Sequence, residues 1–212
     1  MGTVSSMAKP LDLPFDPIAR AGDIWERTWG PASAMRVATS VMRVQQILLA
    51  RYDEALRPHE LTFARYEALV LLQFSASGAL PLKVIGRRLM VHPTSVTNAI
   101  SRLAAAGLVD RQPNPRDRRG VLAAITDEGR QVAEAATKDL LAMDFGLGVL
   151  DEAARDTMFA MLRVIRAESG DFRVPPESAA ASGGAGPASG GAAPGGHPTD
   201  AWCAPDESSW TT

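Results

Sequence analysis

The sequence predicts a mainly α-helical fold that carries one two-stranded β ribbon. Apolar residues recur at spacings of three and four along most of residues 16–172, which is the period of amphipathic helices. Two short β-prone stretches, "LVDRQ" at 108–112 and "VLAAIT" at 121–126, flank a polar loop, as in a β ribbon. The chain has 212 residues, of which 46% are hydrophobic and 22% charged, so one sizeable core is expected.

The two ends of the chain differ from this central part. The stretch "GGAGPASGGAAPGG" at 183–196 contains only Gly, Ala, Pro and Ser. Such a composition buries too little apolar surface to offset the entropy cost of ordering. We therefore expect a flexible N-terminus over residues 1–15, a single domain over residues 16–172, and a disordered Gly/Ala/Pro-rich tail over residues 173–212.

Two helices open the domain. Asp16 can cap a helix whose first residue is Pro17, and Gly30-Pro31 ends it. Its apolar face consists of Ile18, Ala21, Trp25 and Trp29. The second helix, over residues 34–56, is apolar on more than one face, with Val37, Val41, Met42, Val44, Leu48, Leu49 and Tyr52. Because one small core cannot use so much apolar surface, the pattern predicts contact with a second copy of the chain.

Three helices follow, before the ribbon. The third helix begins at Leu61-Thr62, with Thr62 as a cap, and ends before Gly78, burying Leu69 and Leu72. A short helix from Pro81 ends at the tight break "MVH", and a second short helix runs from Pro93 to Gly107. This second short helix turns Val96, Ile100 and Leu103 inward and a polar face outward.

Two further helices close the domain. One begins at Thr126 or Asp127 and carries Val132, Ala136 and Leu140 on one face until "GLG" breaks it. The last helix follows the cap Asp151, and we expect it to bury Met158, Met161, Leu162 and Ile165.

The order of these elements is that of a winged helix-turn-helix, in which two helices joined by a tight turn precede a β wing. From Lys83 to Arg119 there are eight basic and two acidic residues, a local charge of +6 in a chain of net charge −2. This segregation of positive charge predicts a polyanionic partner, since each phosphate contact releases counterions. We therefore expect a DNA-binding lobe at about residues 62–126 and helical dimerisation regions at about 16–57 and 127–169.

Individual residues of this lobe suit contact with double-stranded DNA. The outward face of the second short helix is small and hydrogen-bonding, and Asn98 can pair bidentately with adenine. An arginine at a ribbon tip, with Arg118 as first choice, suits a narrow minor groove. The predicted DNA contacts are Lys83, Thr94, Ser95, Thr97, Asn98, Ser101, Arg102, Arg116, Arg118 and Arg119.

The stretch "VHPTSVTNAISRLAAAGLVDRQPNPRDRRGVLAAITDEGR" resembles the DNA-binding core of the MarR family of bacterial regulators, including the D-R-R wing and the following "IT-x-x-G". The resemblance covers roughly residues 34–167. It implies a winged-helix homodimer that binds an inverted-repeat operator, usually as a repressor. It also implies release of DNA when a small aromatic or anionic effector binds between the dimerisation and DNA-binding parts.

The first helix resembles the N-terminal addition of the urate-responsive branch of that family. Matched motif by motif, this resemblance implies ligand contacts at Trp25 or Trp29, at Glu67 where the branch has aspartate, and at Arg111. Ala99 stands where the branch has a recognition-helix arginine, which disfavours urate itself. The alternative for both tryptophans is packing of the added helix against the dimer.

Other classes of function lack support in the sequence. It has no nucleophile elbow, phosphate loop or dinucleotide turn, so an enzyme is the least favoured alternative. A winged helix that binds protein or RNA is the nearer alternative. We predict no metal and no cofactor, because His59, His92 and His197 are scattered and Cys203 lies in the tail. Without an apolar run of membrane-spanning length or a secretory leader, the expected location is the cytoplasm, at the nucleoid.

Overall fold

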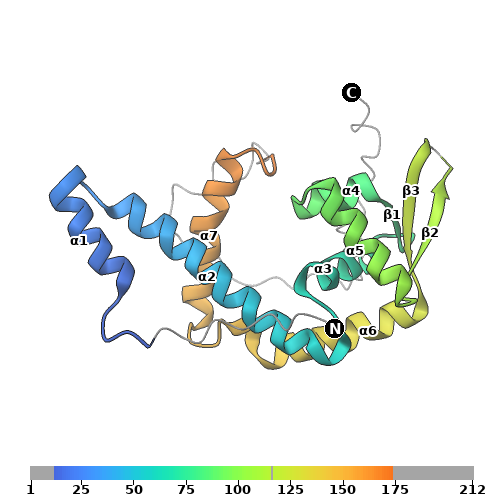
Figure 1. Cartoon of the computed structure of the whole chain (residues 1–212), viewed down its shortest axis with the longest axis horizontal. Coiled ribbons are helices and arrows are strands. Elements are labelled where there is room, and N and C mark those ends of the chain that lie inside the picture. The colour runs from blue at the N-terminus through green and yellow to red at the C-terminus, as the bar shows by residue number, and fades with distance from the viewer. Residues whose placement is uncertain (1–11, 116, 174–212) are drawn as a thin grey trace, which may run out of the picture. The chain divides into compact units, whose positions relative to one another are not determined.

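The computed structural model describes residues 12–115 and 117–173, which form two compact units. The first unit comprises residues 12–73 and 77–146, and the second comprises residues 74–76 and 147–173. Most of the predicted flexible N-terminus and nearly all of the predicted tail lie outside the described residues. The first unit contains, in chain order, α1 (Pro17–Trp29), α2 (Ser33–Leu56), the 3-10 turn η1 (Arg57–His59), α3 (Phe63–Gln73), β1 (Ala79–Pro81), α4 (Leu82–Leu89), α5 (Pro93–Ala105), β2 (Val109–Asn114), β3 (Asp117–Ile125), α6 (Asp127–Ala142) and the 3-10 turn η2 (Asp144–Gly146) (Figure 1).

Helix α1 folds back onto α2 through one arginine. Arg36 of α2 forms ion pairs with Asp23, at 2.8 Å, and with Glu26, at 2.7 Å. Gly22 lies beneath the Arg36 side chain, since a Cβ built on Gly22 would be 2.1 Å from the guanidinium Nε. The side chain of Asp16 accepts the backbone N–H of Ile18, as predicted for a cap.

The start of α3 is capped differently from the prediction. The N–H of Phe63 donates to Oδ1 of Asp53 at 2.8 Å, so the capping oxygen comes from α2. The hydroxyl of Thr62 instead accepts a bond from Nε of Arg65. The predicted cap by Thr62 was wrong because its hydroxyl is engaged by the Arg65 side chain and accepts no backbone N–H of α3.

The sheet has three antiparallel strands in the order β1-β3-β2. Strand β1, which pairs Leu80 with Ala123, was not predicted, because three residues with a proline show no period. Strands β2 and β3 pair from Val109 and Ile125 out to Asn114 and Asp117. The polar loop expected between residues 112 and 121 is therefore shorter than the sequence indicated, since backbone pairing continues into the arginine-rich stretch.

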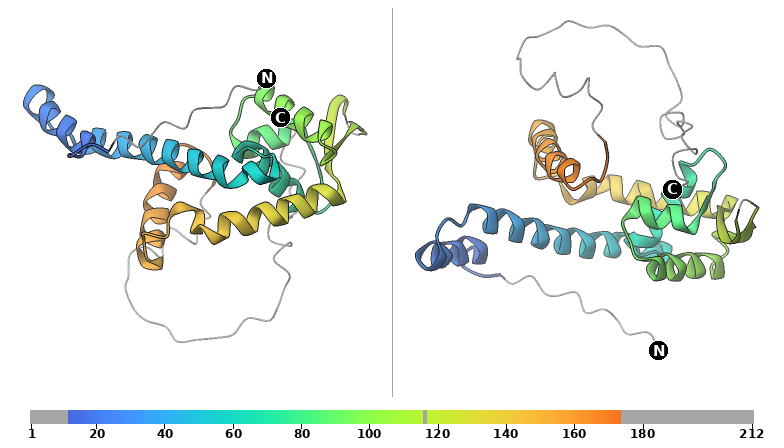
Figure 2. Two further views of the ribbon diagram at one scale, coloured as in Figure 1. Left: turned by 60° about the horizontal axis from the view of Figure 1, so that its bottom comes forward. Right: turned by 90° about the horizontal axis from the view of Figure 1, so that it is seen from above.

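One hydrophobic core joins the end of α2 to α3, α4, α5, β2 and α6. Its largest fully buried side chains are Leu56, Leu69, Leu72, Ile85, Ile100, Leu103, Val109 and Leu140. Helix α6 packs against the same end of α2 (Figure 2), and the Tyr52 hydroxyl donates to the carbonyl of Phe145 at 2.8 Å. The helices α4 and α5 and the ribbon therefore share one interior with the helices that flank them in sequence.

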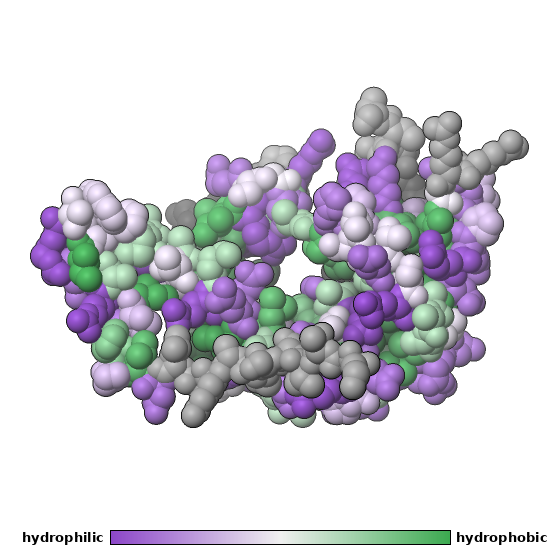
Figure 3. Space-filling view, in the orientation of Figure 1, coloured by the Kyte–Doolittle hydropathy of each residue, from purple (hydrophilic) through white to green (hydrophobic). Residues whose placement is uncertain are grey.

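The apolar stripes of α1 and α2 remain at the surface in a single chain (Figure 3). Trp29 is 71% exposed, Met42 59% and Val37 58%. Apolar side chains exposed in such number on two adjacent helices indicate an interaction surface.

The second unit contains α7 (Glu152–Glu168), capped by the side chain of Asp151. The expectation that this helix buries Met158, Met161, Leu162 and Ile165 was wrong for one chain, because α7 has no buried residue. Met161 is 65% exposed and Ile165 56%. Periodicity identifies which face of a helix is apolar but not what covers that face.

Candidate nucleic-acid interface

The turn between α4 and α5 is tight because α4 ends in a left-handed residue and α5 begins at once with a cap and a proline. Met90 ends α4 in the left-handed region, with φ of 52°, and its N–H bonds back to the Arg87 carbonyl. His92 caps α5, since its Nδ1 accepts the N–H of Thr94 at 3.3 Å, and Pro93 occupies the first turn. The predicted break at "MVH" is thereby confirmed.

Helix α5 has the two faces that the sequence predicts. Val96, Ile100 and Leu103 are buried. Gly86 lets α4 approach this inward face, because a Cβ there would be 3.2 Å from Val96 Cγ2. On the outward side are the exposed Thr94, Ser95, Thr97, Asn98 and Arg102, with Ser101 half-buried. The helix contains no acidic residue, so the outward face is polar and carries no negative charge.

Two of the outward hydroxyls already have partners in the protein. Thr97 donates its hydroxyl proton to the Pro93 carbonyl at 3.0 Å, and Ser101 accepts a bond from Nη1 of Arg111 at 3.2 Å. Among the described residues, the side chain of Asn98 has no hydrogen-bond partner. The amide of Asn98 is therefore available to a ligand on this face.

The arginines of the wing divide into those the structure describes and those it does not. Arg111 of β2 is held against α5 through Ser101, so the base of the wing and the polar helix face form one surface. Arg116 lies outside the described residues, and of Arg118 and Arg119 only the backbone, in β3, is described. Their assignment to DNA remains a prediction.

The "IT-x-x-G" motif joins the end of α5 to the start of α6. The hydroxyl of Thr126 accepts the N–H of Gly129 at 3.0 Å, which caps α6, and donates to the Gly107 carbonyl at 2.8 Å. A Cβ on Gly129 would be 2.1 Å from the carbonyl oxygen of Leu108, so this position requires glycine. The motif therefore fixes the turn between α5 and β2 against α6.

Further positive charge flanks the polar helix face. Lys83, Arg87 and Arg88 are exposed on α4. Arg65, at the start of α3, was not predicted as a site residue. Partial burial, and next the charge of Arg102, lower the pKa of Arg65, while the charges of Asp53 and Glu60 act in the opposite direction. A single arginine on a mostly apolar helix gives no signal of this environment in the sequence.

In a single chain, the two predicted tryptophan contacts lie apart from the predicted contact Arg111. The rings of Trp25 and Trp29 pack edge to face with centroids 4.7 Å apart, on a helix that lies at the far end of α2 from β2 in the views of Figures 1 and 2. Arg111 contacts Ser101 on α5. Glu67 is half-buried on α3, and burial raises its pKa. The assignment of these residues to an effector stays a prediction.

Two helices joined by a tight turn and followed by a β ribbon define a winged helix-turn-helix. The model of the MarR family matches residues 59–120. The chain is similar to Sco5413, a MarR family transcriptional regulator from Streptomyces coelicolor. The two are 59% identical with a TM-score of 0.63, over 66% of this chain and 98% of that one. The chain belongs to the MarR family.

Two other proteins show how far the likeness extends. The HTH-type transcriptional regulator YhbI of Bacillus subtilis, itself uncharacterized, is 33% identical over 92 residues. The aligned part is 43% of this chain and 58% of YhbI, so it spans less than two thirds of that relative. A mutant of MarR from Escherichia coli was solved in complex with operator DNA. It is 23% identical to this chain with a TM-score of 0.57, over 63% of this chain and 96% of that one. This similarity is one of fold.

The helices within residues 12–115 and 117–173 include none that combines the length and the hydropathy needed to cross a bilayer.

Proposed function

We propose that this protein is a sequence-specific DNA-binding transcriptional regulator that acts on double-stranded DNA. The observation that carries the proposal is the outward face of α5, which is polar, free of acidic residues and bordered by the basic residues of α4 and by the wing. In a helix-turn-helix the second helix enters the major groove with such a face. The fold shared with a MarR structure that holds operator DNA supports the same function.

The regulator acts as a homodimer on an inverted-repeat operator. The support is the apolar surface of α1 and α2, where Trp29, Val37 and Met42 are each more than half exposed, together with the exposed apolar residues of α7. A two-fold dimer would place its two recognition helices about one helical turn apart on DNA. This surface also agrees with packing of the two tryptophans against the dimer.

The resemblance to the family extends the proposal to repression that a small aromatic or anionic effector relieves. Trp25, Trp29, Glu67 and Arg111 remain the proposed contacts for that effector. Because these residues are separated in one chain, an effector site built from them requires residues of both subunits. The proposed location is the cytoplasm, at the nucleoid.

Footprinting of the full chain on the DNA upstream of its own gene tests this function. We expect protection of an inverted repeat on both strands. Binding to DNA without a preferred sequence, or tighter binding to RNA of equal length, would contradict the proposal and favour a winged helix that binds RNA or protein.

Two variants separate reading of bases from contact with phosphates. Asn98→Ala should lose about 1–3 kcal/mol of discrimination at particular base pairs, because the amide is removed from the recognition face. Arg118→Ala should weaken binding to all sequences and reduce the slope of log K against log salt by about one unit. A uniform loss in Asn98→Ala would show that Asn98 contacts only phosphate, and an unchanged salt slope in Arg118→Ala would show that Arg118 contacts no phosphate.

A further inference from the structure

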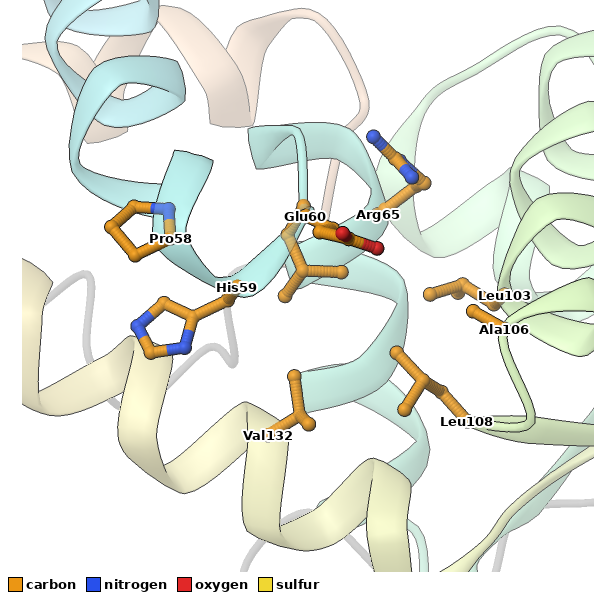
Figure 4. Close-up of a pocket in the computed structure, with 9 residues that line it drawn as sticks. Pro58, His59, Glu60, Arg65, Leu103, Ala106, Leu108 and Val132 are labelled. Atoms are coloured by element: carbon orange, nitrogen blue, oxygen red, sulfur yellow. The ribbon is translucent and has the colours of Figure 1, made fainter.

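A hollow of about 360 Å³ lies beside the C-terminal end of α5, between the chain that links α2 to α3 and the helix α6 (Figure 4). None of its residues belongs to the predicted DNA or effector contacts. Its floor is apolar and rigid, because Leu61, Leu103 and Leu108 are also buried in the core. Its size is at the lower end of the range for small-molecule sites, so it suits a ligand of few heavy atoms.

The rim of this hollow carries two opposite charges, Glu60 and Arg65. They form no close ion pair, although the charge of Glu60 acts to raise the pKa of Arg65. Arg65 donates its Nε to the Thr62 hydroxyl, which leaves both Nη groups available. The carboxylate of Glu60 has no ion-pair partner among the residues that the structure describes. The third polar group, His59, is occupied by Asp139 at 2.7 Å.

The backbone holds Glu60 in an unfavourable conformation. Its φ of 55° lies in the left-handed region, which costs a residue with a Cβ about 1–2 kcal/mol. A left-handed residue is also a common end of a helical turn, and the Glu60 N–H bonds back to the Arg57 carbonyl at the end of η1. Glu60 thereby brings its carboxylate to the same part of the rim as Arg65 (Figure 4).

We propose that this hollow binds a small zwitterion with an apolar side chain, of the chemical class of a free apolar α-amino acid. The Arg65 guanidinium binds the ligand carboxylate, Glu60 binds the ammonium group, and the leucine floor accepts the side chain. A simple organic anion would face the unpaired carboxylate of Glu60. A simple cation would face the positive charge of Arg65.

The site also touches the elements that set the recognition helix. Leu103 and Ala106 come from the end of α5, Leu108 leads into β2, and Glu60 joins the helix α2 to α3. A ligand in contact with all of them changes the affinity for operator DNA, and DNA changes the affinity for the ligand by the same factor. This regulatory consequence, unlike the binding itself, rests on the proposed function.

Calorimetric titration of the full chain with L-leucine and L-phenylalanine tests the site without DNA. We expect saturable binding of one molecule per chain. N-acetyl-L-phenylalanine lacks the ammonium group and L-phenylalanine amide lacks the carboxylate, and each should bind at least about tenfold more weakly, since each loses a charge-assisted hydrogen bond. Absence of saturable binding, or equal binding of all four compounds, would overturn the proposal.

Variants then locate the ligand. Arg65→Gln and Glu60→Gln should each weaken binding at least about tenfold, and Ala106→Phe should abolish it by filling the hollow from its rim. Ala105→Phe is the matched control, because Ala105 is an exposed neighbour that does not line the hollow. Unchanged binding in Ala106→Phe would place the ligand elsewhere and refute the site. If the amino acid binds but footprinting finds no operator, the site stands and the proposed regulation fails.

Discussion

Replacement of Thr126 by valine tests the junction between the recognition helix and α6. The hydroxyl caps α6 by accepting the Gly129 N–H at 3.0 Å, and it donates to the Gly107 carbonyl at 2.8 Å. Valine keeps the shape of threonine but makes neither bond. The substitution therefore removes two hydrogen bonds without creating a cavity.

The expected loss of stability is about 2 kcal/mol. Removal of a threonine cap costs about 1 kcal/mol, and loss of a hydrogen bond to a neutral carbonyl costs about another 1 kcal/mol. In a protein of this size, that corresponds to a melting temperature lower by about 4–8 °C.

The measurement is thermal and urea unfolding at one fixed protein concentration, because unfolding of a dimer depends on concentration. Thr126→Ser is the control, since serine keeps the hydroxyl and should retain most of the stability. A loss below about 0.5 kcal/mol in Thr126→Val, or an equal loss in both variants, would show that these two bonds do not stabilise the fold.

Three other substitutions follow from single contacts. Gly129→Ala should lower the free energy of unfolding in urea by about 1–3 kcal/mol, because the new Cβ meets the Leu108 carbonyl oxygen. This is the opposite of the usual effect, since alanine normally stabilises a helix relative to glycine. Equal stability of the two proteins would show that the start of α6 can move. Asp53→Ala should lower the free energy of unfolding by about 1 kcal/mol, because it removes the acceptor of the Phe63 N–H. Asp53→Asn keeps an acceptor and is the control. Equal losses of stability in the two variants would exclude this cap. Burial raises the pKa of Glu67, so the folded state favours the protonated acid and stability falls as pH rises through that pKa. Glu67→Gln should therefore be more stable than wild type at pH 7, with a difference that disappears below the ordinary pKa of 4.5, and a pH-independent difference would contradict the effect of burial.

Local signals predicted most of the elements. Pro17, Pro93 and Thr126 each mark the start of a helix through a cap or a fixed φ that depends only on residues next to them. The buried face of α5 followed from the spacing of Val96, Ile100 and Leu103, since a helix of known period has only one arrangement of its side chains.

Contacts between distant residues could not be predicted in this way. Strand β1 exists because β3 offers it a free edge, and three residues carry no pattern of their own. The capping of α3 by Asp53 depends on how α2 and α3 pack, and the hollow beside Glu60 and Arg65 depends on α5 and α6, which are far from those residues in sequence. Neither feature is marked by the residue types alone.

The sequence by itself determined the order of the helices, the polar face of α5, the charge around it and the likeness to the MarR family, because these depend on neighbours along the chain. Only the tertiary structure decided which apolar faces are covered in one chain, how far the wing strands pair, and which leucines lie beside Glu60 and Arg65 in the hollow. Burial and proximity are properties of chain segments far apart in sequence, and packing alone brings those segments together.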